Sequence, residues 1–304
     1  MSQFNRPPLI QAELAREIAP GVMVIPDQHS DLVPNIGIIS GTDAVLVVDS
    51  GLGIANGQRV LHKAREIAGA KSLLLTSTHF HPEHAFGTQV FKGLAIIISN
   101  AAQADELQEK GALFLHIFRD LGPEVREALE GVEMVMPDET YQGEKVIDLG
   151  GKQVVLRELA GHTRGDQIVF LPHEGILFTG DLVENRLFPI LFDQDASSRR
   201  WIEALTHMLR LAPTTVVPGH GDLGTTALLQ EVQDFFTFVR EDINLRIKEG
   251  QALELIDKEA ARVIKERYQE WGNDLWIPFV IRSVYAELTG TPLKSPELSV
   301  GSAR

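Results

Sequence analysis

Residues 78–87 read THFHPEHAFG and place three histidines and one acid within six consecutive positions, from His79 to His84. In a chain with 10 histidines and 42 acids, the pattern His-x-His-x-acid-His arises by chance only about 0.0015 times. The segment directly follows the apolar run SLLLTST, which predicts a buried strand. Ligands commonly gather at the carboxyl ends of strands in α/β sheets. The segment therefore predicts a metal site rather than a polar loop that is rich in histidine.

Three more polar residues follow apolar runs in the same way. VVLRELAGH ends in His162, GILFTGD ends in Asp181 and TTVVPGH ends in His220. A glycine directly before each of these residues lets the backbone turn sharply. Gly-His and Gly-Asp turns are common when taken singly, so their order and context along the chain carry the interpretation.

Imidazole nitrogen and carboxylate oxygen suit zinc, and the chain has no cysteine that could supply a thiolate. A catalytic zinc ion keeps one position for water and lowers the pKa of that water toward about 7. Since one ion needs only three or four ligands, the larger set of candidates predicts two ions that share a bridging water. The candidate metal ligands are His79, His81, Glu83, His84, His162, Asp181 and His220.

The order of these motifs resembles the pattern of the metallo-β-lactamase-fold hydrolases, which is H-x-H-x-D-H, then Gly-His, Thr-Gly-Asp and a final Gly-His. The resemblance runs from about Val22 to His220, and it is specific for fold and metal but weakly specific for substrate. It implies two Zn²⁺ ions, with iron or manganese as open alternatives. It implies the following ligand sets: His79, His81 and His162 for the first ion, Glu83 or His84 with His220 for the second, and Asp181 as the bridge. VLVVDSG at Asp49 is similar to the family's first strand and turn, where the acid supports the metal loop.

Glu83 departs from the family pattern, which usually has Asp at this position. The extra methylene moves the carboxylate by more than about 1 Å if nothing else adjusts. Glu83 is therefore expected either to bind the second ion and act catalytically, orienting or deprotonating the water, or to leave that site weak. A structural acid that binds no metal is the third alternative. The variant H-x-E-x-D-H marks diiron oxygen reductases, and His81 in the middle position argues against them.

The apolar runs alternate with glycine-rich turns and helical stretches, which predicts a layered α/β sandwich. With the resemblance, the expected fold is a four-layer αββα metallo-β-lactamase sandwich over residues 1–224, followed by a helical extension over residues 225–304 that ends in a frayed tail. Predicted strands are Val22–Ile25, Ile36–Ser40, Ala44–Asp49, Ser72–Thr76, Ala95–Ser99, Val132–Met136, Lys145–Asp148, Gln153–Leu159, Gln167–Leu171, Gly175–Thr179 and Thr214–Val217. Predicted helices include Gly57–Ala68, Ala101–Gly111 and Ser197–Leu211, with extra helices between Lys110 and Gly131.

Composition narrows the class of function. The net charge of −14 disfavours a nucleic-acid partner, because an acidic surface repels phosphate backbones. No apolar stretch reaches the roughly 18 residues that a membrane span needs. The first residues lack a signal-peptide pattern, so we expect a cytoplasmic protein that acts on a small-molecule substrate, with homo-oligomer formation left open.

The leading hypothesis is a zinc-dependent hydrolase of a small acyl compound, namely an ester, thioester, lactone or β-lactam. SSRRWIEAL and IRSVYAEL are similar to segments of sulfur-oxidation-associated and quinoprotein-relay metallohydrolases. The main alternative is an oxidoreductase like the persulfide dioxygenases, which share the fold but use one iron. A tRNA-processing nuclease and a metal-free homologue are less favoured. The segment ALFLHIFRDLG around His116 carries an apolar stripe that is expected to be core, with lining of the cleft as the alternative. The apolar segment LFPILF at residues 187–192 is expected to form either a lip over the metals, which is favoured, or a subunit contact.

Overall fold

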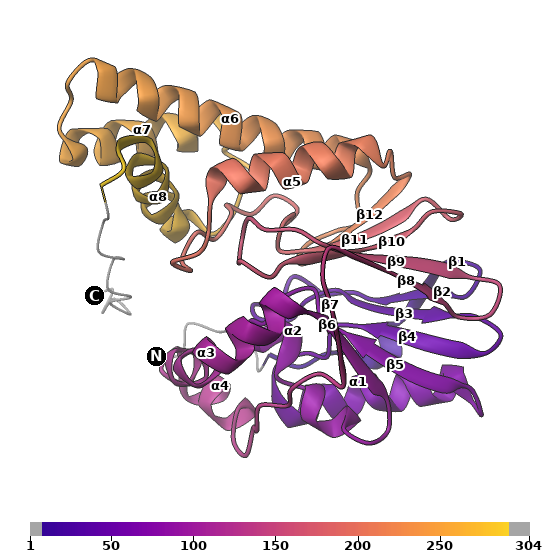
Figure 1. The fold of residues 1–304 in the computed structure, drawn as a ribbon. Coiled ribbons are helices and arrows are strands. Elements are labelled where there is room, and N and C mark those ends of the chain that lie inside the picture. Colours follow the sequence, from indigo (N-terminus) through magenta and orange to yellow (C-terminus); the bar gives the residue numbers. More distant parts are fainter. Residues whose placement is uncertain (1–7, 292–304) are drawn as a thin grey trace.

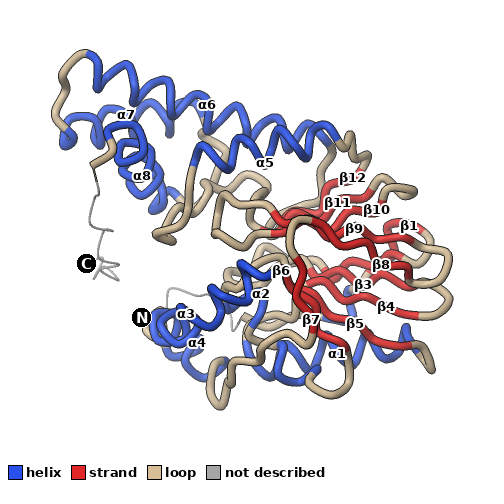
Figure 2. The backbone as a smooth tube through the Cα atoms, viewed as in Figure 1, coloured by secondary structure: helices blue, strands red, loops and turns tan. Residues whose placement is uncertain are grey.

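The chain forms two stacked sheets with helices on both outer faces, as Figure 1 shows. The computed structural model describes residues 8–291. In Figure 2 the strands lie in the middle of the molecule and the helices lie outside them. The expected four-layer αββα metallo-β-lactamase sandwich with C-terminal helices is confirmed.

The first sheet has seven strands in sequence order, and the second has five in the order β12-β11-β10-β9-β8. The first sheet consists of β1 (Arg16–Ala19), β2 (Val22–Ile25), β3 (Ile36–Ser40), β4 (Ala44–Val48), β5 (Ser72–Thr76), β6 (Ile96–Asn100) and β7 (Glu139–Tyr141). The second sheet consists of β8 (Glu144–Asp148), β9 (Gln153–Glu158), β10 (Gln167–Leu171), β11 (Ile176–Gly180) and β12 (Thr215–Pro218). The helices are α1 (Gly53–Ala68), α2 (Pro82–Ala85), α3 (Ala101–Arg119), α4 (Pro123–Ala128), α5 (Ser198–Arg210), α6 (Thr226–Lys248), α7 (Leu253–Arg267) and α8 (Ile277–Thr289), with short 3-10 turns η1 (Ala12–Leu14), η2 (Thr88–Phe91) and η3 (Asp274–Trp276).

Burial on both faces explains the continuous apolar runs. In β4, Val45 and Val47 pack into the core cluster that includes α1, while Leu46 and Val48 pack into the cluster between the two sheets. Successive side chains of a strand point to opposite faces, so a strand covered on both sides needs an apolar residue at every position. Fully burying such a side chain contributes about 1.5–3 kcal/mol. The run AVLVV therefore fixes β4 in the middle of the sandwich.

The C-terminal helices share one core with the second sheet. Leu177 of β11 and Val216 of β12 belong to the same buried cluster as Trp201 of α5, Phe236 of α6 and Val280 of α8. Trp201 is fully buried, and its indole N–H donates to the carbonyl oxygen of Leu182 at 2.7 Å. Figure 1 shows α5 and α6 along the outer face of this sheet, with α7 and α8 beyond one end of it. The division into domains at residue 224 stays a prediction.

Most predicted elements are present, but the predicted strand Val132–Met136 is wrong. This segment has no regular structure. Val132 and Met134 pack against the cluster around α4, and Val135 packs against the cluster that includes α1, so these apolar side chains serve core packing without any strand pairing. The strand that pairs with β6 is β7, which begins only at Glu139. The predicted frayed tail at residues 295–304 lies outside the described residues.

The helices predicted between Lys110 and Gly131 correspond to the C-terminal part of α3 and to the separate helix α4. α3 continues to Arg119, well beyond the expected end at Gly111, and α4 follows. Within residues 8–291 no helix has the length and apolar character that a membrane span requires.

Strand direction brings the candidate ligands together. β4 and β5 run parallel, as do β11 and β12, so the ends of each pair lie at one edge of their sheet. Asp49 follows β4, His79 lies just beyond β5, Asp181 follows β11 and His220 follows β12. The loop between β9 and β10 adds His162. The two sheets therefore present five polar positions at a shared edge of the sandwich.

Candidate metal centre

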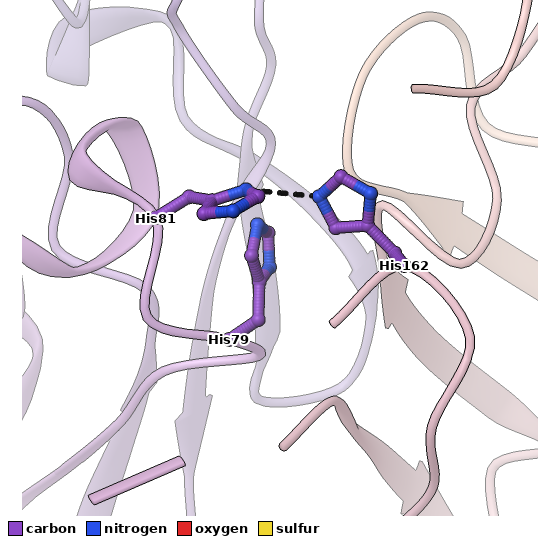
Figure 3. A group of neighbouring side chains, drawn as sticks. All are labelled: His79, His81 and His162. Atoms are coloured by element: carbon purple, nitrogen blue, oxygen red, sulfur yellow. Dashed lines mark hydrogen bonds between the residues drawn. The ribbon is translucent and has the colours of Figure 1, made fainter. Parts of the chain in front are cut away.

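Three imidazoles converge from two loops to form the first group of candidate ligands. Figure 3 shows His79 and His81 from the segment after β5, and His162 from the loop after β9. Nε2 of His162 lies 2.9 Å from Nδ1 of His81. All three side chains are buried. Their ligand atoms all lie within 4.8 Å of one another.

Four residues form the second group, namely Glu83, His84, Asp181 and His220. One potential ligand atom from each of them lies within the same limit of 4.8 Å. Glu83 and His84 come from the short helix α2, whose first position is Pro82. All four side chains are buried. The seven residues predicted from sequence therefore meet in two groups.

Asp181 faces both groups with different oxygens. Its Oδ2 atom lies 3.8 Å from Nε2 of His79 and 3.8 Å from Nε2 of His162. Its Oδ1 atom lies 3.2 Å from Nε2 of His84 and 3.7 Å from Nε2 of His220. A carboxylate in this position can contribute one oxygen to each of two ions.

Hydrogen bonds fix the outer nitrogen of most of these histidines. His162 Nδ1 donates to the carbonyl oxygen of Ile190 at 2.9 Å, and His220 Nδ1 donates to that of Val33 at 3.1 Å. His84 Nδ1 donates to Asp49 at 2.9 Å. Such contacts set the tautomer and leave the lone pair of Nε2 pointing inward, as a metal ligand requires.

Asp49 supports the metal loop without joining either group. Its Oδ1 atom accepts from the backbone N–H of Thr78 at 2.6 Å, and its Oδ2 atom accepts from the Thr78 hydroxyl at 3.0 Å as well as from His84. Thr78 Oγ1 in turn lies 3.2 Å from Nδ1 of His79 and can accept its proton. Asp49 therefore orients one histidine of each group, which is the role that the sequence resemblance implied.

Buried polar atoms without a hydrogen-bond partner show whether the two groups fit a cation. Among residues 8–291, Nε2 of His79, Nε2 of His84, Oε2 of Glu83 and Oδ1 of Asp181 are buried without a hydrogen-bond partner. A buried polar atom without a partner costs about 1–3 kcal/mol. These atoms belong to the two groups, and their nitrogen and oxygen chemistry suits zinc and similar divalent ions. Both groups therefore fit a metal ion.

The comparisons with known proteins agree with this geometry. The family description "Metallo-beta-lactamase superfamily" matches residues 29–220, well over half of the chain and all seven candidate ligands. The chain belongs to the metallo-beta-lactamase superfamily.

Proteins similar to this chain have names that give different substrates. The acyl-coenzyme A thioesterase MBLAC2 of Homo sapiens is 29% identical over 161 residues, 49% of this chain and 58% of that protein, so the match spans little more than half of its length. The type 2 metallo-beta-lactamase of Bacteroides fragilis is 26% identical over 208 residues, 66% of this chain and 75% of that protein. A solved metallo-beta-lactamase family protein from Thermus thermophilus has a TM-score of 0.65 at 16% identity, covering 90% of this chain and 95% of that one.

Burial keeps His79 and His162 of the first group neutral. It lowers the pKa of His79 well below its usual value, and the charge of His84 adds to the effect. Burial also lowers the pKa of the His162 imidazole to about 3, with His81 adding to the effect. Neutral imidazoles keep a free lone pair at neutral pH, so these histidines need not lose a proton before they bind a cation.

The second group behaves differently because of its carboxylates. Burial opposes protonation of His84, but the charges of Asp181 and Asp49 outweigh it and raise the pKa of His84 well above its usual value. His84 and His220 in turn hold the pKa of Asp181 well below its usual value, although burial acts in the opposite direction. A cation bound here would take the place of the His84 proton, since metal ligands must be deprotonated.

Glu83 and a second buried acid, Glu184, lie at this group. Glu83 occupies the position where the superfamily usually has Asp, and its side chain is 6% exposed. Burial and the charge of Asp181 raise the pKa of Glu184 well above its usual value, with Glu83 adding to the effect. Sequence reasoning missed Glu184, which closely follows Asp181 in GDLVE. The available signal in the sequence was an acid only three positions after Asp181 of the TGD motif.

The remaining predicted features lie at different distances from the centre. His116 itself is 75% exposed on α3 and pairs with Asp120 at 3.5 Å, so it belongs to neither ligand group. Phe114 of the same apolar stripe is buried in a core cluster and also stacks on His81, with ring centroids 4.8 Å apart. The segment at residues 187–192 does lie beside the centre, because Ile190 accepts from His162 and Phe192 contacts Phe114 with ring centroids 6.2 Å apart. Whether it also forms a subunit contact stays a prediction.

Gly219 gives a test of how tightly Asp181 is held. A Cβ atom at Gly219 would lie 1.9 Å from Oδ1 of Asp181, which is closer than any atoms pack. We expect Gly219→Ala to displace this carboxylate and to weaken metal binding by at least about tenfold, as outer-shell substitutions do. Isothermal titration of metal-free protein with Zn²⁺ measures this change.

Gly111→Ala is the matched control for this substitution. Its Cβ would meet only the ends of flexible side chains, Met134 at 3.0 Å and Leu107 at 3.3 Å, and it lies inside α3, where alanine is favoured over glycine. Unchanged zinc affinity in both variants would contradict a close fit between Gly219 and Asp181.

Proposed function

We propose that this protein is a metal-dependent hydrolase that uses two divalent ions, zinc being the first to test, to cleave a small acyl compound. The class of substrate comprises esters, thioesters, lactones and β-lactams. The proposal rests on the position of Asp181, whose two oxygens face two separate groups of buried ligand atoms. One mononuclear site would not need this arrangement.

The ligand sets follow from the two groups. His79, His81 and His162 would hold the first ion, Glu83, His84 and His220 the second, and Asp181 would serve both. When bound, such ions supply Lewis acidity and make water nucleophilic at neutral pH.

The protein's own groups would orient and protect this chemistry. The Glu83 carboxylate, with its Oε2 atom free of a partner among the described residues, is placed to accept a proton from a water at the second group. The buried Glu184 beside it, whose raised pKa favours the protonated form, is suited to return a proton to a leaving group. Asp49 and Thr78 would keep His79 and His84 in one tautomer.

Apolar side chains border the first group. The ring of His81 stacks on Phe114, with centroids 4.8 Å apart and planes at 19°. Phe192 lies next to Phe114 and contacts Trp276 and Phe279 of the C-terminal segment. These rings exclude water from one side of the centre and favour a substrate with an apolar acyl part. Thioesters are the first substrates to test, because the human relative described above is an acyl-coenzyme A thioesterase.

The proposal is tested with a panel of chromogenic esters, thioesters, lactones and a cephalosporin, run on protein of measured metal content. We expect hydrolysis of at least one acyl substrate by protein with two zinc ions per chain. Complete chelation is expected to abolish this activity, and added Zn²⁺ to restore it. Activity that survives complete chelation would contradict the mechanism. Oxygen consumption with a persulfide by protein that holds a single iron would support the dioxygenase alternative instead.

A further inference from the structure

His81 differs from the other four histidines of the centre in how its ring is turned. Its Nδ1 atom faces inward, 2.9 Å from Nε2 of His162, so its Nε2 atom is the outer nitrogen. That outer nitrogen has no hydrogen-bond partner among residues 8–291, whereas the outer nitrogens of His84, His162 and His220 each have one. What orients His81 is therefore open.

Asp193 is the side chain that faces this nitrogen. Its Oδ2 atom lies 4.0 Å from Nε2 of His81, and it too is buried without a hydrogen-bond partner within the described part of the chain. Both side chains are almost fully buried. A buried donor and a buried acceptor that both lack a partner are stabilised by a hydrogen bond to each other. A shift of about 1 Å brings His81 Nε2 and Asp193 Oδ2 to hydrogen-bond distance.

A partly buried cluster of charges holds Asp193 from its other side. The Lys110 ammonium donates to Oδ1 of Asp193 at 2.8 Å, to Glu106 at 2.9 Å and to Asp195 at 2.6 Å. The three acids have the spacing of a metal site. Lys110 already supplies their positive charge, so this cluster needs no third ion.

The same cluster also reaches the loop that carries His162. Glu106 is fully buried on α3, and its carboxylate accepts from the backbone N–H groups of Arg164 at 3.2 Å and Gly165 at 2.7 Å. α3, the His162 loop and the segment around Asp193 are therefore joined through one set of contacts. Such a connection fixes the carboxylate of Asp193 relative to the first group.

We propose that Asp193 is a positioning residue that accepts the Nε2 proton of His81 and so directs its Nδ1 lone pair toward the first metal ion, with Lys110 as the anchor of Asp193. The inference rests on the proposed metal centre, but not on the identity of the substrate. Carboxylate partners of metal-binding histidines typically change metal affinity by about 10- to 100-fold when they are removed.

Asp193→Ala and Asp195→Ala form the test pair. Both variants remove a carboxylate that Lys110 contacts, but only Asp193 faces His81. Zinc affinity is measured by competition with a chromophoric chelator on metal-free protein, without any substrate. We expect Asp193→Ala to lower the affinity for one of the two zinc ions by about 10- to 100-fold and to leave the affinity for the other nearly unchanged. Asp195→Ala is expected to leave both affinities unchanged.

Two further measurements separate orientation from stability. The visible absorption of the Co²⁺-loaded protein reports the coordination of the ion and is expected to change in Asp193→Ala but not in Asp195→Ala. Asp193→Asn, whose amide oxygen can still accept the His81 proton, should restore part of the affinity. Equal loss in the two alanine variants, or no loss in Asp193→Ala, would overturn the inference. Wild-type protein that binds no zinc at the first group would contradict the metal centre itself.

Discussion

Replacing His81 with alanine is expected to lower kcat/KM for the acyl substrate by roughly 10³-fold or more, because a bound ion contributes several kcal/mol and each 1.4 kcal/mol is about tenfold. The substitution removes one of the three nitrogens of the first group, and His79 and His162 alone leave that ion with an incomplete ligand set. Steady-state kinetics together with metal content measures both effects on one preparation.

The fold of the His81→Ala variant is expected to remain intact. His81 lies in a loop at the edge of the sandwich, outside the apolar clusters that hold the sheets together. His116→Ala is the control, because His116 is exposed on α3 and should leave turnover unchanged. Circular dichroism that shows global unfolding of the His81 variant would mean that the ion is structural rather than catalytic.

Replacing Asp181 with asparagine is expected to reduce both metal binding and turnover, the latter again by roughly 10³-fold or more. The change keeps the size of the side chain but removes the negative charge that faces both groups. The amide keeps only one oxygen, so at least one group loses its oxygen ligand, and the metal content is expected to fall from two ions to one or fewer. Elemental analysis after dialysis measures this content directly.

Asp222→Asn provides the control for the charge change. Asp222 follows His220 closely in sequence, but its side chain is 77% exposed and pairs only with the exposed His29 at 3.6 Å among the described residues. We expect this variant to keep both ions and full turnover. Two tightly bound ions in Asp181→Asn would show that the carboxylate is not shared between the groups.

Much of the candidate site could be predicted from the sequence because each candidate follows an apolar run. The strands β5, β11 and β12 end just before His79, Asp181 and His220, and strand direction then fixes where these side chains meet. Their role as metal ligands stays a prediction. The sandwich could be predicted for the same reason, since runs such as AVLVV need cover on both faces.

The contacts around the site could not be predicted in this way. Asp193 and Lys110 are 83 positions apart, and nothing in the sequence near either residue indicates that they pair beside His81. The inward Nδ1 of His81 also depends on a ring orientation that the motif H-x-H does not specify. The wrong prediction of a strand at Val132–Met136 has a similar origin. A short apolar segment favours a strand by its sequence alone, and only the tertiary contacts decide whether it pairs with another strand.

Anomalous diffraction at the zinc absorption edge, from crystals grown with zinc, is the most direct test of the two-ion centre. We expect two peaks about 3.5–4 Å apart. One should be surrounded by His79, His81 and His162 and the other by Glu83, His84 and His220, with one oxygen of Asp181 beside each. A single peak, or a pair of peaks away from Asp181, would contradict the account.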